Sequence, residues 1–197
     1  MYRKFIKRLL DLLVSIPASL VVLLVVIPVA IAIKLEDRGP VFYNANRLGK
    51  DMVPYKMYKF RSMKVNAPDI RNEDGTTYNA EDDPRVTKVG RFIRKTSIDE
   101  LPQIFNVFLG NMSFVGPRPS PTGNEYNYSE SFLRKFTVLP GITGYNQAML
   151  RNAATSEQRE KNDLYYVDNM SFLLDLKIIL YTIKSVFQRE NINRNAS

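Results

Sequence analysis

The sequence predicts an α+β protein, mostly helical with a small β element, that is attached to a membrane by one N-terminal helix. Three observations support this fold class. Residues 12–33 contain no charged side chain. Residues 41–43 and 55–60 are rich in aromatic residues and are typical of short strands separated by a turn at 46–51. Apolar residues recur at helical spacing in residues 98–109 and 171–189.

The uncharged segment is long enough to reach across a bilayer. Its 22 residues would form a helix of about 33 Å, against a hydrocarbon core of about 30 Å. Basic residues flank it on both sides, and they favour a cytoplasmic location for both ends: Arg3, Lys4, Lys7 and Arg8 before it, and Lys34, Arg38, Arg47 and Lys50 after it. A bent helix that enters and leaves the same face satisfies both flanks, with breaks at Pro17 and Pro28. Two alternatives are a kinked spanning helix and a signal peptide, although the apolar run exceeds the usual signal length.

The remaining segments are divided by glycine and proline. A helix is expected to start near Ile98 or Asp99, with Pro102 in its first turn, and to end at Gly110. A last helix should cover residues 171–189, with an apolar face that packs in the core or lies on the membrane surface. Residues 113–121, with three prolines, and the turn-rich residues 140–144 predict irregular structure, and residues 64–84 predict a mobile loop.

The composition narrows the chemistry. The chain has no Cys and no His, so thiol nucleophiles, thiolate metal sites and imidazole bases are excluded. Acid–base or nucleophilic work must fall to Asp, Glu, Lys, Tyr or Ser. The formal net charge of +8 suits anionic partners such as phosphate substrates, acidic lipid head groups or nucleic acid.

Two adjacent acidic residues, Asp99 and Glu100, lie at the predicted helix start. Capping of the helix is one explanation, because free N–H groups and the helix dipole favour carboxylates there. The same location would keep a carboxylate ionised, as a nucleophile or a magnesium ligand requires. Basic residues recur on either side of the pair and would bind phosphate oxygens as a set: Lys59, Arg61, Arg85, Lys88, Arg91, Arg94, Lys95, Arg118 and Arg151.

Eight motifs, in order, resemble the bacterial sugar transferases of the monotopic phosphoglycosyl transferase type, in their minimal catalytic form. The resemblance covers nearly the whole chain. The motifs are Arg47-x-Gly49, Tyr58-Lys59-Phe60-Arg61-Ser62-Met63, Asp83-Pro84-Arg85-Val86-Thr87, Asp99-Glu100-Leu101-Pro102-Gln103, Asn106-Val107, Met112-Ser113-Phe114-Val115-Gly116-Pro117-Arg118-Pro119, Pro140-Gly141-Ile142-Thr143-Gly144 and Tyr165-Tyr166.

The resemblance implies transfer of a sugar-1-phosphate from a UDP-sugar to polyprenyl (undecaprenyl) phosphate, with release of UMP. This would begin capsule, O-antigen, exopolysaccharide or glycoprotein glycan assembly. Asp99 would attack the sugar-linked phosphorus and form a phosphosugar-aspartate intermediate, and Glu100 would help to bind Mg²⁺. Arg94 and Arg118 would bind phosphates or uridine, and Lys59 and Arg151 would belong to the same substrate-binding shell.

The resemblance also implies an organisation and a location. Residues 1–38 would form the N-terminal basic segment and re-entrant membrane helix. Residues 39–190 would form a cytoplasmic catalytic domain with amphipathic interfacial helices, and residues 191–197 a polar tail. The chain would lie in the bacterial inner membrane, in contact with membrane lipid. Downstream glycosyltransferases and a homodimer are further partners to consider, and no nucleic acid is expected. The alternative function is a membrane-anchored scaffold or an inactive relative in a glycan assembly complex.

Three positions depart from the family's pattern. The Ser-Pro break expected near the middle of the membrane helix falls at Leu23-Leu24, and Pro17 and Pro28 flank that point. Asn111 stands where Asp is common, so it receives no metal role. Residues 145–151 lack the usual aromatic and glycine, which weakens any inference about the sugar.

Overall fold

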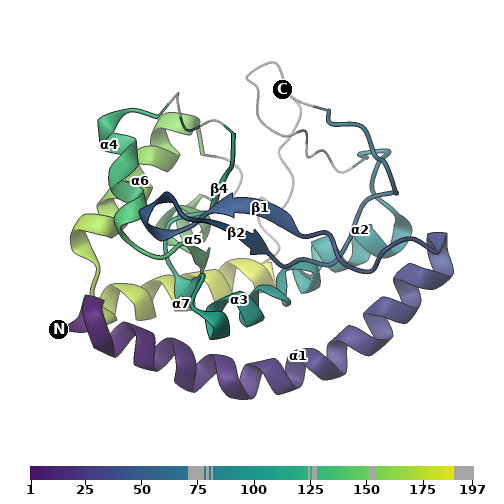
Figure 1. Ribbon diagram of the computed structural model, residues 1–197, viewed down its shortest axis with the longest axis horizontal. Helices are drawn as coiled ribbons and strands as arrows, with labels where there is room; N and C mark the ends of the chain where they lie inside the picture. The colour runs from purple at the N-terminus through teal and green to yellow at the C-terminus, as the bar shows by residue number, and fades with distance from the viewer. Residues whose placement is uncertain are drawn as a thin grey trace.

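The structure, a computed structural model, describes residues 1–70, 78, 80, 82–123, 125, 128–150 and 154–188. Helices predominate and the strands are short (Figure 1), so the α+β prediction is confirmed. In chain order the elements are η1 (Tyr2–Ile6), α1 (Lys7–Asp37), β1 (Ala45–Leu48), η2 (Lys50–Met52), β2 (Pro54–Met57), α2 (Lys88–Lys95), η3 (Ile98–Glu100), α3 (Gln103–Leu109), β3 (Ser113–Val115), β4 (Ser120–Pro121), α4 (Glu130–Leu133), η5 (Arg134–Thr137), β5 (Gly141–Thr143), α5 (Tyr145–Met149), α6 (Ser156–Asn169) and α7 (Phe172–Gln188).

The small β element consists of an antiparallel sheet in the order β2-β1-β4 and a parallel pair, β3 and β5. The predicted strand at 41–43 is wrong, since Phe42 makes only an isolated bridge. The turn lies later than expected: the Gly49 N–H donates to the Val53 carbonyl at 2.9 Å, and Asp51 has a φ of 54°. Ala45 therefore pairs with Met57, and β1 extends into the predicted turn.

Short strands also form where prolines and glycines predicted irregular structure. Pro117 and Pro119 lie between β3 and β4, where no ladder donor is needed, and Pro121 ends a two-residue edge strand. Gly141 begins β5, which pairs with β3. Position 141 requires glycine because the chain directly after β3 comes so close that a Cβ there would lie 2.1 Å from the Gly116 nitrogen. Both predictions of irregular structure were therefore wrong at these strands.

The N-terminal helix is continuous. Together η1 and α1 form a helical stretch, Tyr2–Asp37, of 36 residues. Its most apolar 18-residue window has a mean hydropathy of 2.9, so the stretch is long and apolar enough to cross a membrane. Pro17 and Pro28 lie inside α1 without ending it. The predicted breaks are therefore wrong, and α1 instead bows gently along the rest of the molecule (Figure 1).

Both ends of α1 bind the same body of the protein. At its start, the Lys7 ammonium lies 2.6 Å from an Asp175 oxygen on α7. At its end, Asp37 forms a bidentate pair with the Arg61 guanidinium at 2.5 Å, and Glu36 accepts the backbone N–H of Lys88 at 2.6 Å, at the start of α2. The domain lies on the concave side of the bow (Figure 1).

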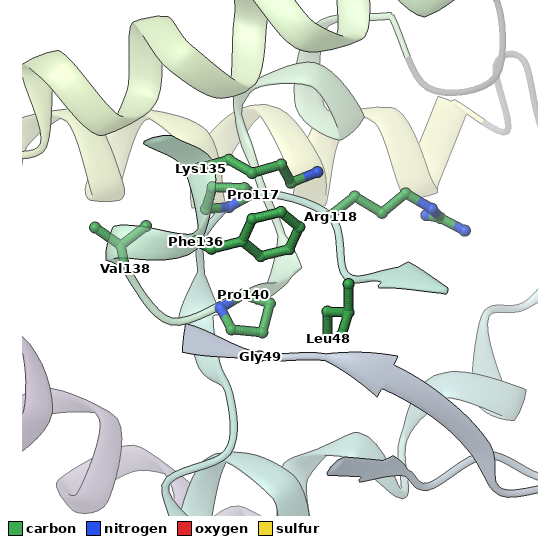
Figure 2. A pocket seen from close by; sticks show the side chains of 8 residues that line it. All are labelled: Leu48, Gly49, Pro117, Arg118, Lys135, Phe136, Val138 and Pro140. Carbon is green, nitrogen blue, oxygen red and sulfur yellow. The ribbon is translucent and has the colours of Figure 1, made fainter. Parts of the chain in front are cut away.

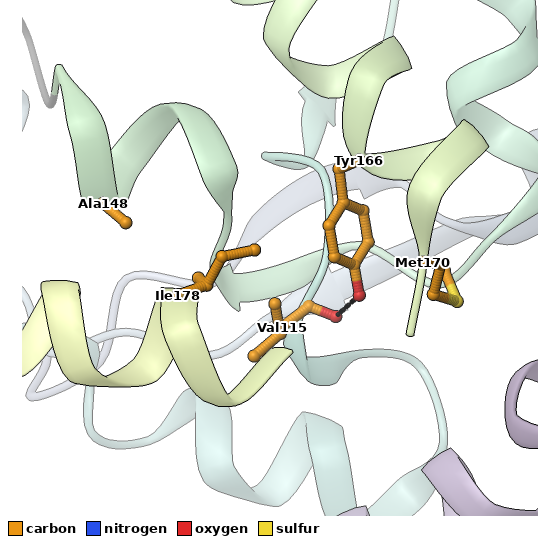
Figure 3. Close-up of a cluster of buried hydrophobic side chains, with 5 residues drawn as sticks. All are labelled: Val115, Ala148, Tyr166, Met170 and Ile178. Atoms are coloured by element: carbon orange, nitrogen blue, oxygen red, sulfur yellow. Dashed lines mark hydrogen bonds between the residues drawn. The ribbon is translucent and has the colours of Figure 1, made fainter. Parts of the chain in front are cut away.

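One hydrophobic cluster joins α5, α6, α7 and β3. It consists of Val115, Ala148, Tyr166, Met170 and Ile178 (Figure 3). The Tyr166 hydroxyl lies 3.1 Å from the Val115 carbonyl oxygen, to which it donates, and 2.7 Å from Oδ1 of Asp175. A buried hydroxyl with partners costs little to bury, so Tyr166 of the Tyr165-Tyr166 motif has a structural role.

A second cluster connects α1 to the acidic pair. Its buried centre consists of Phe60 together with Ile33 of α1 and Ile93 of α2, and Ile98 packs against it. Since Phe60 follows Lys59 and Ile98 precedes Asp99, the end of the apolar helix packs directly behind the predicted site.

The last helix matches its prediction closely, with α7 at Phe172–Gln188. Its core-facing side contains Asp175 and Ile178, which are buried. Most of the apolar face predicted from the sequence is exposed. The exposed residues are Phe172, Leu173, Leu176, Ile179, Leu180 and Ile183. This exposure favours the membrane-surface alternative over the core alternative.

Candidate active site

Asp99 lies in a single 3-10 turn, η3, between α2 and α3. Ser97 enters the turn in the left-handed conformation with a φ of 57°. The Asp99 residue is only 3% exposed, and its carbonyl accepts the Phe60 N–H at 3.0 Å. The predicted helix start was wrong in detail, because α3 begins at Gln103, with Pro102 as its N-cap and no side-chain cap. The capping explanation for the carboxylates is therefore not supported.

Lys59 lies between the two carboxylates. Its Nζ is 2.7 Å from Oδ2 of Asp99 and 3.4 Å from Oε1 of Glu100. The Asp99 side chain is 4% exposed and that of Glu100 is 32% exposed. Asp99 is therefore enclosed behind the ammonium group, while Glu100 has an edge that faces solvent.

The charges of this trio influence one another. Burial raises the pKa of Asp99 above its ordinary range, Lys59 counteracts part of that rise, and Glu100 adds to it. Burial alone would lower the pKa of Lys59, but the carboxylates of Glu100 and Asp99 outweigh it, and the pKa is raised. The expectation that its location alone keeps Asp99 ionised is thus corrected: its charge depends on Lys59.

A buried amide from α3 holds the segment that carries Lys59. The Asn106 Oδ1 accepts the Tyr58 N–H at 2.9 Å, and its Nδ2 donates to the Lys56 carbonyl at 2.8 Å. Asn106 is fully buried. The sequence analysis included Asn106 in a motif without assigning it a role, since nothing in the sequence indicates which strand an amide will bind.

Two of the predicted arginines join the trio. The charge of Arg94, on α2, contributes to lowering the pKa of Asp99, and the charge of Arg118 acts on Lys59. Both charges therefore act on members of the trio, Arg94 on Asp99 and Arg118 on Lys59. The predicted binding residue Arg151 lies outside the described residues.

Other members of the basic set have structural partners. Arg61 binds Asp37 at the end of α1 and also donates to the Pro40 carbonyl at 2.5 Å. The buried Arg85 pairs with Asp83 at 2.8 Å, and this pairing lowers the pKa of Asp83. These two arginines hold the backbone in place. Among the described members of the basic set, Lys59 contacts the carboxylates, and Arg94 and Arg118 act on the trio through their charges.

Asp99 and Glu100 could bind a hard divalent cation such as Mg²⁺ only together with a phosphate ligand from the substrate. In the part of the chain that the structure describes, no three acidic side chains lie close enough together to bind a metal ion. Mg²⁺ characteristically takes one or two carboxylates and completes its shell with water and substrate phosphates. Glu100, with its exposed edge, and Asp99 beside it fit that requirement, so Glu100 would hold the ion that the resemblance implies.

Comparisons with known proteins identify the family of this chain. Residues 2–189 match the family model described as bacterial sugar transferase, and the chain belongs to that family. It is 43% identical over 189 residues to a galactosyl transferase, CpsE, of Streptococcus agalactiae serotype III. It is 40% identical over 190 residues to the UDP-glucose:undecaprenyl-phosphate glucose-1-phosphate transferase of Escherichia coli K12.

The lengths of these relatives differ. The matches cover 91% and 90% of this chain, but only 42% and 40% of those two relatives. The sugar transferase EpsL of Bacillus subtilis 168 is 40% identical over 189 residues, which cover 96% of this chain and 91% of EpsL. The chain thus spans less than half of some relatives and nearly all of another.

Proposed function

We propose that this protein transfers a sugar-1-phosphate from a UDP-sugar to undecaprenyl phosphate and releases UMP. The main support is the trio at the site, in which the Lys59 ammonium lies 2.7 Å from the buried carboxylate of Asp99 and 3.4 Å from Glu100. The Escherichia coli relative acts, by its name, on UDP-glucose and undecaprenyl phosphate. A relative in Salmonella typhimurium is named as an undecaprenyl-phosphate galactose phosphotransferase.

The proposed reaction consists of two displacements at the site. An Asp99 oxygen forms a bond to the sugar-linked phosphorus, the bond from that phosphorus to the bridging oxygen breaks, and UMP leaves with the electron pair. A phosphate oxygen of the acceptor then attacks the same phosphorus and releases Asp99. Neither nucleophile has to lose a proton at neutral pH, so a site without histidine suffices.

The surrounding charges have distinct tasks. Lys59 keeps Asp99 ionised and neutralises phosphate charge as the bond forms. Arg94 and Arg118 bind the phosphate oxygens of the donor. When bound, Mg²⁺ would neutralise charge on the diphosphate. Glu100 would hold that ion beside the solvent-facing edge of the site.

The membrane helix is proposed to be re-entrant. A straight span would place its two ends on opposite sides of the bilayer, yet the salt bridges at Lys7 and Asp37 attach both ends to one domain. The exposed apolar residues of α1 and α7 would enter the lipid of the inner membrane, with the domain on the cytoplasmic face, where UDP-sugars are made.

The test is UMP release by detergent-purified protein supplied with Mg²⁺, undecaprenyl phosphate and a panel of UDP-sugars. We expect one preferred donor and one UMP per lipid-linked sugar formed. Correctly folded protein that produces no UMP from any donor would favour the scaffold alternative.

The variant Glu100→Gln tests the role in metal binding. Because an amide is a weaker ligand for Mg²⁺ than a carboxylate, we expect the Mg²⁺ concentration for half-maximal UMP release to rise about tenfold or more. The measurement is a Mg²⁺ titration of both proteins at saturating donor. An unchanged midpoint with a lower plateau would remove Glu100 from the metal site.

Single cysteines test the topology, since the chain has none of its own. Lys4 lies just before the start of α1. Lys88 lies beside the end of α1, where its backbone N–H binds Glu36, and both residues are exposed. We expect Lys4→Cys and Lys88→Cys both to react with a membrane-impermeant maleimide in inverted vesicles and neither in intact spheroplasts. Reaction of the two cysteines from opposite sides would establish a spanning helix.

A further inference from the structure

The C-terminal end of α1 contacts the two segments that carry Asp99 and its lysine partner. These contacts come from Ile33, Glu36 and Asp37, which lie near the end of the helix. The reaction steps proposed above use neither Glu36 nor Asp37, and the sequence analysis gave neither a role. Both carboxylates bond to parts of the chain that follow α1, so they serve the domain as well as the helix.

Asp37 holds the segment that carries Lys59 through the guanidinium of Arg61. Its two carboxylate oxygens lie 2.5 Å from the two terminal nitrogens of Arg61, whose side chain is 6% exposed. The same side chain donates to the Pro40 carbonyl at 2.5 Å and to the Met63 carbonyl at 2.9 Å. A planar guanidinium that binds both oxygens of a carboxylate has a defined orientation. The chain at Arg61 is therefore fixed relative to the end of α1.

Backbone pairing extends this anchor to Lys59. The Arg61 N–H donates to the Val41 carbonyl, and the Tyr43 N–H donates to the Lys59 carbonyl, both at 2.9 Å. These two bonds lie on either side of Phe60, which is fully buried. The main chain that carries the ammonium group is thus fixed to the segment that leaves α1.

Glu36 holds the other segment, which leads to Asp99. Its carboxylate oxygens accept the backbone N–H groups of Lys88 and Val89 at 2.6 and 2.9 Å, at the first two positions of α2. Such N–H groups have no partner within their own helix, and the helix dipole favours a carboxylate beside them. Helix α2 ends at Lys95, and Asp99 follows in η3. The start of this segment is therefore also fixed to the end of α1.

The two segments meet at the candidate site. The Phe60 N–H donates to the Asp99 carbonyl at 3.0 Å, and the Lys59 ammonium lies 2.7 Å from Oδ2 of Asp99. Behind them, Ile33 of α1 packs with Phe60 and with Ile93 of α2. A short stretch of α1 thus contacts both segments that form the ion pair.

The loop that carries Arg118 has a separate anchor. The Gly116 N–H donates to the Thr143 carbonyl, and the Gly141 N–H donates to the Pro117 carbonyl, both at 2.9 Å. The Arg118 side chain extends from this loop beside a small cavity (Figure 2). None of the bonds described above joins this loop to the C-terminal end of α1, so its amides serve as an internal reference.

We infer that Asp37 and Glu36 are positioning residues, which fix the main chains carrying Lys59 and Asp99 to the end of the membrane helix. The inference rests on the proposed function, because it concerns residues of the same reaction. It implies that the placement of α1 determines how closely the ammonium group approaches the carboxylate. A purely structural role would change the stability of the fold without a specific link to Lys59.

Two variants of the ion pair test the Lys59 side. Asp37→Asn keeps the shape and removes the charge, and Arg61→Lys keeps the charge but loses the fork that binds both oxygens. We expect each to lower kcat for UMP release about tenfold, because a small displacement of a catalytic group slows the reaction strongly. Asp37→Glu restores a carboxylate and should recover most of the rate. Thermal unfolding identifies folded variants, and Arg61→Lys keeps a paired charge if Asp37→Asn does not fold.

Coupling to Lys59 is the decisive kinetic readout. Lys59→Met is expected to lower UMP release about 100-fold in wild type, but only about tenfold in Asp37→Asn or Arg61→Lys, where the ammonium group is already displaced. Effects that multiply in full in a folded variant would overturn the inference.

A matched carboxylate supplies the control for Glu36. Glu157 lies in the first turn of α6 and is exposed, so its replacement also removes a negative charge from the start of a helix. We expect Glu36→Ala to lower kcat about three- to tenfold and Glu157→Ala to stay within about twofold of wild type. Equal rates in the two variants would overturn the role assigned to Glu36.

Residue-resolved hydrogen exchange tests the positioning without any chemistry. In Asp37→Asn and Arg61→Lys, the Phe60 amide, which joins the two segments, should exchange about tenfold faster than in wild type, while Gly116 and Gly141 keep their rates. Faster exchange at Phe60 alone supports the positioning role even if wild type releases no UMP, a result that would reject only the proposed function. Wild-type exchange at Phe60 in a folded variant refutes the positioning role.

Discussion

Replacement of Asp99 by asparagine is expected to reduce UMP release by roughly 10⁴-fold or more, because it removes the proposed nucleophile. Asparagine has nearly the same shape, and the Asp99 side chain is almost completely buried. Lys59 keeps Glu100 as a partner at 3.4 Å. Since burial raises the pKa of Asp99, its ionised form is destabilised by the fold, and an uncharged amide should be tolerated. The variant should therefore be inactive but folded.

Intact-mass spectrometry identifies the cause of this loss. Wild type incubated with donor and Mg²⁺, without lipid acceptor, should gain the mass of one sugar phosphate, and added undecaprenyl phosphate should discharge it. Asp99→Asn should gain nothing, while Glu100→Gln should still form some adduct at high Mg²⁺. An adduct on Asp99→Asn, or substantial UMP release by it, would assign the nucleophile to another residue.

The sequence selected chemical groups that the structure places near one another. Lys59 contacts both Asp99 and Glu100, and the charges of Arg94 and Arg118 act on members of this trio. The roles of these residues in phosphate chemistry stay a prediction. The role of Lys59 as direct partner of both carboxylates depends on a contact across 40 residues, which local pattern cannot supply. The same applies to Asn106, whose two amide bonds reach back to the segment before Lys59.

The errors in the fold predicted from the sequence have a common origin. The strands β1, β3, β4 and β5 have between two and four residues, too few to show alternation. Apart from the β1–β2 hairpin, their pairing partners are distant in the chain. Pro17 and Pro28 remove donors from α1, but the helix continues because the domain packs along it, through residues such as Ile33. Tertiary contacts override local preference in both cases.

Loss of the ammonium group in Lys59→Met is expected to lower UMP release at neutral pH by about 100-fold. Lys59 lowers the pKa of Asp99 and so offsets part of the effect of burial. Without it, the pKa of Asp99 rises, a smaller fraction of the carboxylate is ionised at neutral pH, and the acidic limb of the rate profile moves to higher pH. Part of the lost rate should therefore return as the pH is raised.

The measurement is UMP release against pH at saturating donor and Mg²⁺ for wild type, Lys59→Met and Lys59→Arg. Arginine retains the positive charge, so its acidic limb should stay near that of wild type even if its bulk reduces the maximal rate. The methionine profile should be displaced because Asp99 then loses the charge of its direct partner and keeps that of Arg94. Equal limbs in all three proteins would mean that Lys59 acts on the donor phosphates alone and leaves the ionisation of Asp99 to other groups.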